Sequence, residues 1–597
     1  MERDDQSPSD STPPSDLQNA VIRFAGNSQD GIQTIGGFLA KLAGRSAREV
    51  MTYMTIPSTI SGGPSIFQVH LGSGEVLSPG DEADFLVAFY QHSYDNHIGS
   101  LRDGGVCIYD TDNVEPVANE RGLQHVGIPI TSTTVEALGG STRERGKNLF
   151  VLGLVTNLFK LDREKVVALI DRQFGRKGED VIRNAMLAFD AGYGYSLGSD
   201  VLYQSWALRD GLSVDTDRMT TDGNTALMYG LIAGGVRYGS GYPITPWSSI
   251  MEGLRSELPK YGGLFVQAED ELGAVSMALG FAYAGHLSIT GSSGPGLSLK
   301  MEALSYAVMA ELPLIVVNVQ RGGPSTGLPT SVEQSDLMQA IYGSHGDAPR
   351  IVLAPKNVED CFYIAIEACQ LARKYSCPVL ILSDSALATR IEAFKEPDLD
   401  ACLIEPTLDQ EPRGEEFKPY PVDAPTRHAP PGTKMLGGKY PVVTGLEHDE
   451  WGHPSASPEM HAKMNAKRRE KIKAVAADLP LPEVFGEESG DVLLVGWGST
   501  WGPIREATKR AKDKGLSVSS IHIRHLNPLP NGFEEIFAKF KHVLVVEMND
   551  EGLYGFGQLA TLLRARYCDS KIQSICKTDG LNFRIREILE GITKHTS

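Results

Sequence analysis

Four polar features lie in the stretch from Gly239 to Pro329, each where an apolar, strand-like run ends. They are Thr245 in the segment YPITP, Glu271 in EDELGAVSMALG, the segment TGSSGPG at 290–296, and Arg321 directly after LPLIVVNVQ. In open parallel sheets, ligands bind outside the carboxyl ends of the strands. The spacing therefore predicts a ligand site at one edge of an α/β sheet.

Three of these side chains are suited to chemistry, and each also has a purely structural interpretation. The prolines beside Thr245 hold its hydroxyl and backbone in place, as they would in any rigid turn. Glu271 begins an apolar helix, where a carboxylate interacts with the helix dipole or, in an apolar pocket, shares a proton. Glu269 and Asp270 compete for that role. Arg321 suits recognition of a carboxylate or carbonyl oxygen, or a structural ion pair.

The segment TGSSGPG combines backbone freedom with hydroxyl groups. Its three glycines allow a ligand to approach the backbone closely, and Ser292 and Ser293 supply the hydroxyls. It is not a P-loop, because no lysine follows as in GxxxxGK[ST]. A second turn, GNSQDG at 26–31, joins a strand-like and a helix-like run. It suits a phosphate cradle and an ordinary βα turn equally well.

The composition excludes several classes of protein. A net charge of −19 over 597 residues argues against nucleic-acid binding, which needs clustered lysine and arginine. The seven cysteines form no CxxC pair, which argues against a zinc ribbon or an iron–sulfur loop and indicates reduced thiols. No signal-peptide pattern and no apolar run of about 18 residues occurs, so we expect a cytoplasmic protein that does not enter the membrane.

The alternation of strand-like and helix-like runs predicts a multidomain α/β protein. Residues 390–488 interrupt it with a Pro-rich, charged segment, which predicts an extended connector over another surface. A basic, helix-like run, MHAKMNAKRREKIK, follows within it. The expected organisation is a disordered tail (1–16), an α/β domain (17–200), a second α/β domain (201–389), the connector (390–488) and a third, parallel α/β domain (489–597).

A family resemblance rests on four segments in order: GYPITPWSS, QAEDELGA, TGSSGPGLSLKMEAL and NVQRGGPSTGLPT. They resemble the α subunit of 2-oxoacid:ferredoxin oxidoreductases, thiamine-diphosphate enzymes that oxidatively decarboxylate a 2-oxoacid to its acyl-CoA. The resemblance covers most of the chain. It implies that 17–200 is a γ-type domain fused ahead of a pyrimidine-binding-type domain (201–389), and that 489–597 is a transketolase-C-terminal-like domain.

The resemblance also implies roles for individual residues. Glu271 would hydrogen-bond the aminopyrimidine ring nitrogen of thiamine diphosphate, the contact that activates the cofactor. Thr245 would bind the 2-oxoacid carboxylate, and Arg321 would hold the keto acid. The fused arrangement favours 2-oxoglutarate, with pyruvate and branched-chain 2-oxoacids as alternatives. The expected pocket residues are Pro243, Ile244, Gly291, Ser292 and Ser293, and the candidates for a second substrate carboxylate are Ser325, Thr326 and His345.

Two departures concern the γ-type domain. Asn27, Ser28 and Asp30 occupy a turn that is richer in glycine in the family, and Asp30 would repel a CoA phosphate. The family's Arg-Gly-Gly is Ser61-Gly62-Gly63 here.

Two absences predict a partner. The chain contains no GDG diphosphate motif and no iron–sulfur cysteines. The resemblance then implies a β subunit that carries the diphosphate site, Mg²⁺ and a [4Fe–4S] cluster, with no metal on this chain, in an (αβ)₂ assembly that uses CoA and reduces ferredoxin. The alternatives are a thiamine-dependent transketolase or dehydrogenase relative, against which the γ-type domain argues, and a non-catalytic binding module.

Overall fold

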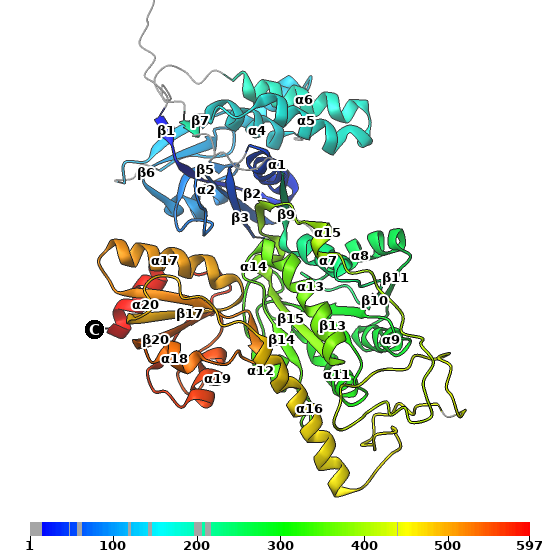
Figure 1. The fold of residues 1–597 in the computed structure, drawn as a ribbon. Helices are drawn as coiled ribbons and strands as arrows, with labels where there is room; N and C mark the ends of the chain where they lie inside the picture. Colours follow the sequence, from blue (N-terminus) through cyan, green and yellow to red (C-terminus); the bar gives the residue numbers. More distant parts are fainter. Residues whose placement is uncertain are drawn as a thin grey trace, which may run out of the picture. The chain divides into compact units, whose positions relative to one another are not determined.

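The computed structural model describes residues 15–46, 48–55, 63–117, 121–140, 146–195, 206–208, 217–438 and 440–596. The chain divides into two compact units, Met1–Thr220 with Ile391–Glu396 and Thr221–Arg390 with Pro397–Ser597. Figure 1 labels their elements. Of the expected tail, residues 1–14 lie outside the described residues, as do Ser61 and Gly62, whereas Ser15–Leu17 forms strand β1.

The first unit contains a mixed eight-stranded sheet in the order β7-β6-β5-β2-β4-β3-β16-β9. The neighbours β2, β5, β6 and β7 run parallel, whereas β4 is antiparallel to β2 and β3, and β16 is antiparallel to β3. The strands are β2 (Asn19–Asn27), β3 (Glu49–Met54), β4 (Pro64–Gly72), β5 (Ala83–Ala88), β6 (Leu101–Asp110), β7 (Gln124–Ile128), β9 (Arg218–Asp222) and β16 (Ile391–Lys395); β1 pairs separately with β8 (Trp206–Leu208).

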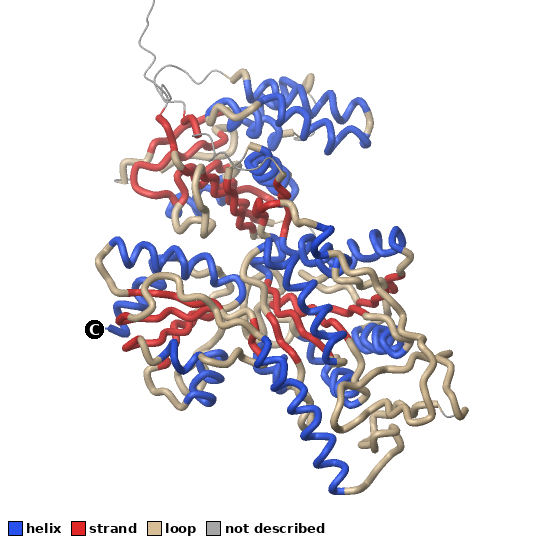
Figure 2. Tube along the Cα trace, viewed as in Figure 1, coloured by secondary structure: helices blue, strands red, loops and turns tan. Residues whose placement is uncertain are grey.

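Helices of the first unit bury their apolar residues with this sheet in one core that contains Phe24, Phe38, Phe67 and Phe150. Figure 2 shows the helices and strands of this unit. The helices are α1 (Ile32–Arg45), α2 (Gln91–His97), α3 (Ile130–Ala137), α4 (Lys147–Leu158), α5 (Arg163–Phe174) and α6 (Glu179–Tyr193).

The turn GNSQDG is closed by its own carboxylate. Asp30 accepts hydrogen bonds from the backbone N–H of Asn27, at 2.8 Å, and from the hydroxyl of Tyr90, at 2.9 Å. Lys147 Nζ in turn donates to Tyr90 Oη at 3.0 Å. A carboxylate in this position disfavours a bound phosphate, in line with the expectation from the sequence.

Two strands of the first sheet lie beyond the boundaries expected at residues 200 and 389. Arg218 of β9 donates to the carboxylate of Glu49 and to the carbonyl of Ala393. The N–H of Ile391 donates to the hydroxyl of Thr52 at 2.8 Å. These long-range contacts attach both strands to the edge of the sheet, and local sequence patterns do not report them.

The second unit contains a seven-stranded sheet in the order β11-β10-β12-β13-β15-β14-β19, parallel except for β19. Every residue of β13 and β15 is buried, as expected for central strands covered on both faces. The strands are β10 (Tyr238–Gly241), β11 (Leu264–Gln267), β12 (Ser288–Ser292), β13 (Leu314–Gln320), β14 (Ile351–Leu353), β15 (Pro378–Asp384) and β19 (His525–Asn527).

The same unit contains the C-terminal sheet, with the order β18-β17-β20-β21. All its described pairings are parallel, which confirms the parallel alternation predicted for this part of the chain. One apolar core includes Val316 and Leu380 of the seven-stranded sheet together with Leu493 and Val545 of the C-terminal sheet. The strands are β17 (Gly490–Gly496), β18 (Val518–His522), β20 (Phe540–Glu547) and β21 (Ile572–Cys576).

The helices of the second unit include those that carry the candidate site residues. They are α7 (Gly223–Ala233), α8 (Ser248–Glu257), α9 (Glu271–Tyr283), α10 (Pro295–Leu299), α11 (Met301–Met309), α12 (Leu337–Tyr342), α13 (Val358–Tyr375), α14 (Ser385–Thr389), α17 (Trp501–Asp513), α18 (Phe533–Phe537), α19 (Gln558–Tyr567) and α20 (Ile585–Thr596).

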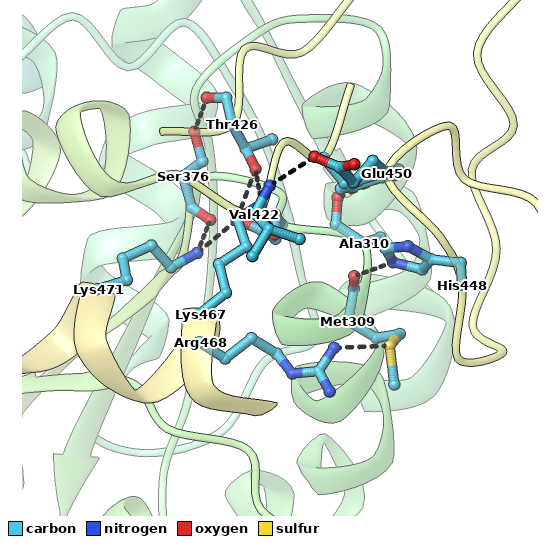
Figure 3. Close-up of polar contacts among 12 residues, drawn as sticks. Met309, Ala310, Ser376, Val422, Thr426, His448, Glu450, Lys467, Arg468 and Lys471 are labelled. Atoms are coloured by element: carbon cyan, nitrogen blue, oxygen red, sulfur yellow. Dashed lines mark hydrogen bonds and ion pairs between the residues drawn. The ribbon is translucent and has the colours of Figure 1, made fainter. Parts of the chain in front are cut away.

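The connector consists of the short helix α15 (Leu399–Cys402), irregular loops and helix α16 (Pro458–Asp478). The helix contains the basic run, as predicted. Figure 3 shows how the loops and α16 reach the end of α11: His448 Nε2 lies 3.3 Å from the carbonyl oxygen of Met309, and Arg468 contacts the Met309 sulfur. Beyond Glu396, the connector therefore lies against the end of α11 in the second unit.

None of the helices in the described ranges is long and apolar enough to cross a membrane. None of the seven cysteines, all of which lie in the described ranges, forms a disulfide bond, and four of them are buried.

Candidate active site

The candidate site lies where the strand order of the seven-stranded sheet reverses. From β10 the chain passes through α8 to β11 on one side, and then through α9 to β12 on the other side of β10. The loops after β10 and β12 therefore diverge at a topological switch point, the usual ligand crevice of such sheets. The parallel register of β10, β12 and β13 brings the loops with Thr245, TGSSGPG and Arg321 to one edge.

Glu271 is the first residue of α9, and Asp270 caps that helix. The Asp270 carboxylate accepts the N–H of Gly273 at 2.7 Å, so capping does not require Glu271. Glu269 is exposed, whereas Glu271 is only 8% exposed. Among the described residues, none donates a hydrogen bond to the Glu271 carboxylate. The structure thus gives the three neighbouring acids different environments, and it leaves the buried carboxylate of Glu271 available for a ligand.

Buried hydroxyls lie at the end of β12, close to this carboxylate. The hydroxyl oxygens of Thr290, Ser292 and Ser293 are buried and have no hydrogen-bond partner in the described part of the chain. A Cβ atom on Gly296 would lie 1.9 Å from Ser292 Oγ and 2.7 Å from Glu271 Oε1. Both oxygens therefore converge on the α-carbon of Gly296, where only glycine leaves them room.

Gly291 is required by packing. A Cβ atom there would lie 2.3 Å from the ring of Trp247, which is fully buried. The sequence interpretation expected close approach of a ligand at the glycines of this segment; in the structure, packing against Trp247 also requires glycine at position 291. Trp247 directly precedes α8 and so couples the loop after β10 to the loop after β12.

Lys300 is a buried cation beside the same helix, and the sequence interpretation missed it. Its Nζ donates to the backbone carbonyl of Glu271 at 3.0 Å. Burial lowers the pKa of Lys300 to about 8, although the charges of Glu271 and Asp270 favour its protonated form. The available signal was a lysine within a largely apolar helical run, LSLKMEAL.

Arg321 and Thr245 are in contact. Arg321 directly follows β13, is 4% exposed, and donates from Nη1 to the backbone carbonyl of Thr245 at 2.8 Å. Its Nε has no partner among the described residues. Burial lowers the pKa of Arg321, and the nearby Asp336 opposes that shift. The side chain of Thr245 is exposed, as is Pro243, and Ile244 is half-buried.

A cavity of about 920 Å³ opens beside Arg321, within the size range of small-molecule sites. Ser325 lines it together with Arg321. Thr326 is exposed and does not line it. His345 is exposed in a loop whose neighbours, Ser344 and Gly346, line a different cavity. The structure thus brings Arg321, Thr245 and Ser325 to one region and places His345 elsewhere.

The cavity also contains acidic groups that the sequence interpretation missed. Asp336 accepts a hydrogen bond from Asn318 Nδ2 at 2.8 Å. Burial raises the pKa of Asp336, the negative charge of Glu333 adds to this, and Arg321 and Asn318 oppose it. A polar asparagine inside the apolar run LPLIVVNVQ was the signal, because a polar side chain in a buried strand needs a partner.

Gln334 joins this wall of the cavity to the C-terminal sheet. Its side chain donates to the carbonyl of Trp497 at 2.8 Å and accepts the N–H of Met548 at 3.0 Å. The loop after β20 completes the lining with Leu553 and Tyr554, which are 95% and 85% exposed. Two large apolar side chains so exposed at the mouth of a cavity indicate a surface that another molecule covers.

A buried carboxylate without a donor, unpaired buried hydroxyls and a nearby buried arginine at a switch point are features of a small-molecule-binding site in an α/β protein. Three family models match the chain. Residues 229–467 match the thiamine-diphosphate-binding domain of pyruvate flavodoxin/ferredoxin oxidoreductase, 21–195 match pyruvate ferredoxin/flavodoxin oxidoreductase, and 490–588 match core domain II of pyruvate:ferredoxin oxidoreductase.

Whole-chain comparisons agree with these matches. The chain is 37% identical to the 2-oxoglutarate oxidoreductase subunit KorA of Mycobacterium tuberculosis, over 96% of this chain and 91% of that protein. It is 30% identical to the 2-oxoacid:ferredoxin oxidoreductase 1 subunit alpha of Aeropyrum pernix, over 96% and 97%. A solved 2-oxoglutarate:ferredoxin oxidoreductase from Magnetococcus marinus, with 2-oxoglutarate, coenzyme A and succinyl-CoA bound, matches with a TM-score of 0.87 and 34% identity over 98% of this chain and 100% of that one.

The chain belongs to the 2-oxoacid:ferredoxin oxidoreductase family. The resemblance stated from the four central segments and the expected multidomain α/β fold class are confirmed.

Proposed function

We propose that this chain is the α subunit of a CoA-acylating 2-oxoacid:ferredoxin oxidoreductase that acts on 2-oxoglutarate. The observation that carries the proposal is the buried Glu271 carboxylate, which no described residue hydrogen-bonds, beside unpaired buried hydroxyls. The substrate follows from similarity: the relative from M. tuberculosis is named for 2-oxoglutarate, and the structure from M. marinus contains it.

The residues present fit the aminopyrimidine part of thiamine diphosphate. That ring system presents both hydrogen-bond donors and acceptors, and the site offers the carboxylate of Glu271 with the hydroxyls of Ser292 and Ser293. When bound, the cofactor supplies the carbon nucleophile that attacks the 2-oxoacid carbonyl. Glu271 would hold a proton at the ring nitrogen, and the low polarity around it would strengthen that hydrogen bond. Gly291, Pro243 and Ile244 complete the proposed pocket.

Arg321 and Thr245 would orient the 2-oxoacid. The guanidinium of Arg321 has an unused Nε–H and lines the cavity, so it can donate to a carboxylate or keto oxygen of the substrate. Its bond to the Thr245 carbonyl restricts its rotation before substrate arrives. For the distal carboxylate of 2-oxoglutarate we assign Ser325, which lines the cavity, ahead of the other two candidates, Thr326 and His345, which do not line it.

The active enzyme would need a partner β subunit. We place the diphosphate site, Mg²⁺ and a [4Fe–4S] cluster on that subunit, because this sequence lacks the GDG motif and the clustered cysteines. The exposed Leu553 and Tyr554 at the cavity mouth support a covering partner. We expect an (αβ)₂ assembly in the cytoplasm that passes electrons to ferredoxin and transfers the acyl group to CoA.

The test is the substrate profile of the chain co-expressed with its β subunit. The expected result is CoA-dependent oxidation of 2-oxoglutarate with ferredoxin or a viologen as acceptor, and a lower kcat/KM for pyruvate and branched-chain 2-oxoacids. Preference for pyruvate or a branched-chain acid would retain the reaction class and overturn the substrate. Activity with NAD but not with ferredoxin would overturn the class and favour a thiamine-dependent dehydrogenase.

A further inference from the structure

A second cavity, of about 800 Å³, lies in the second unit and shares no lining residue with the cavity beside Arg321. The end of α12, the loop up to Arg350, helix α16 and the segment after β19 line it. Figure 1 shows α12 beside α16. Neither the proposed cofactor site nor the proposed substrate site uses this cavity, so its chemistry requires a separate explanation.

Arg350 is a buried cation in the lining of this cavity, and no carboxylate pairs with it. The residue is 0% exposed. Its Nη2 donates to Ser344 Oγ at 2.7 Å, its Nη1 lies 3.9 Å from the sulfur of Met301, and its Nε has no partner among the described residues. Burial lowers the pKa of Arg350 to about 10, so the guanidinium remains charged at neutral pH.

Arg524, in the same unit, pairs with two carboxylates although its side chain is 26% exposed. Its Nη2 lies 2.8 Å from Asp360 and 3.1 Å from Glu367. A buried charge without such a partner costs several kcal/mol, because desolvation is not offset. Arg321, which also lacks an ion-pair partner among the described residues, lines the proposed substrate cavity. An anion in the second cavity would offset the desolvation cost of the Arg350 guanidinium, as the carboxylates do for Arg524.

Further cations line the cavity in a chain whose net charge is −19. Arg469 and Lys473 lie four residues apart on α16 and therefore on one face of the helix, and Arg566 lies on α19. Two carboxylates oppose these charges: Asp347 lines the cavity, and Glu470 pairs with both Arg469 and Lys473. The cavity therefore retains an excess of positive charge.

Apolar groups share the lining with these cations. Ile341, Ile472 and Ala476 contribute aliphatic surface, and Tyr342 contributes an aromatic ring. Tyr342 is 65% exposed, so its ring is accessible from solvent. Guanidinium groups recognise phosphate through paired N–H donors, and a mixed apolar and polar lining is typical of small-molecule sites.

We propose that the second cavity binds a small organic diphosphate. Its phosphate oxygens would lie on Arg469 and Lys473 of α16 and offset the charge of the buried Arg350, and its organic part would lie on Tyr342 and Ile472. Several cations spread over two walls suit a diphosphate better than a single carboxylate. The site is separate from the proposed catalytic region and does not depend on the substrate assigned there.

The test is calorimetric titration of the full chain with inorganic pyrophosphate and with ADP. We expect both to bind, and ADP to bind more tightly because its base adds apolar contact. Arg350→Met and the double variant R469E/K473E should each weaken pyrophosphate binding at least tenfold. Lys512→Glu, an exposed lysine on α17, is the matched control and should change the affinity less than twofold.

Absence of pyrophosphate binding to the unaltered chain, or equal binding by the R469E/K473E variant, would overturn the proposal. Arg469 and Lys473 are 59% and 64% exposed, so this variant keeps the test valid even if Arg350→Met does not fold. CoA also contains a diphosphate, so KM for CoA should be measured in the co-expressed complex. If the R469E/K473E complex has the same KM for CoA as the unaltered complex, the site binds a free nucleotide. A tenfold higher KM in the variant would assign the site to CoA.

Discussion

Replacement of Glu311 should test how the connector is held on the second unit. Glu311 follows α11, and its side chain is 3% exposed. Lys467 Nζ and Lys471 Nζ of α16 lie 2.7 and 2.8 Å from its two oxygens. The hydroxyl of Thr426 donates to the same carboxylate and accepts from Lys467. Figure 3 shows Lys467 and Lys471 of α16 beside Thr426 and Ser376. Glu311→Gln would leave the buried ammonium group of Lys467 and the partly buried one of Lys471 without this countercharge.

Two independent arguments give the loss in free energy of unfolding expected for Glu311→Gln. Breaking a buried ion pair by removing one partner costs about 3–5 kcal/mol. Burial raises the pKa of Glu311, but the ammonium groups of Lys471 and Lys467 outweigh that effect and hold it at about 2, against an ordinary value of 4.5. At about 1.4 kcal/mol per pKa unit, that difference corresponds to about 3 kcal/mol. Since the two arguments agree, we expect Glu311→Gln to lower the free energy of unfolding by about 3 kcal/mol.

The assay is urea denaturation of the full chain, followed by circular dichroism. Lys463→Met is the matched control, because Lys463 lies on the same helix and is 52% exposed, so its loss should leave the free energy of unfolding nearly unchanged. Combining Glu311→Gln with Lys467→Met should restore part of the loss, since fewer buried charges then lack a partner. A loss below about 1 kcal/mol for Glu311→Gln would refute the reasoning, because it would show that solvent already screens the pair.

Further predictions concern pH and the candidate site. Because the folded-state pKa of Glu311 is lowered, its stabilising contribution is complete above pH 4.5 and is lost as the pH falls toward 2; denaturation midpoints from pH 6 to pH 2.5 should decline less in Glu311→Gln. Glu271→Gln should reduce kcat of the assembled enzyme by about 10²–10⁴ without changing the unfolding midpoint, and full activity would exclude the proposed role. Arg321→Lys should lower kcat/KM for the 2-oxoacid about 10–100-fold, since a charge-assisted hydrogen bond contributes about 1.5–3 kcal/mol, whereas KM for CoA should not change. Gly291→Ala should destabilise the chain by about 1–3 kcal/mol, because the added methyl group would overlap the ring of Trp247; an unchanged unfolding midpoint would contradict this packing.

Much of the fold could be predicted from the sequence, because its determinants are local. The apolar runs that became β13 and β15 are long enough and apolar enough to require burial on both faces. The basic run in the connector formed helix α16, as expected from its composition. The first sheet was less predictable, since β9 and β16 join it through contacts such as Arg218 with Glu49 and Ile391 with Thr52. Such pairings depend on residues far apart in the chain.

Some features of the candidate site could likewise be predicted from the sequence, and others could not. The sequence by itself determined that Glu271, TGSSGPG and Arg321 follow strand-like runs, because strand ends and helix starts are local features. From residue types alone, Glu269 and Asp270 competed with Glu271, which the family resemblance favoured. The tertiary structure then assigned the cap to Asp270 and buried Glu271. The contact of Arg321 with Thr245, the burial of Lys300 and the unpaired charge of Arg350 were decided by the tertiary structure alone. The reason is physical: burial and pairing of a charge depend on what distant segments place around it, and a linear pattern does not contain that information.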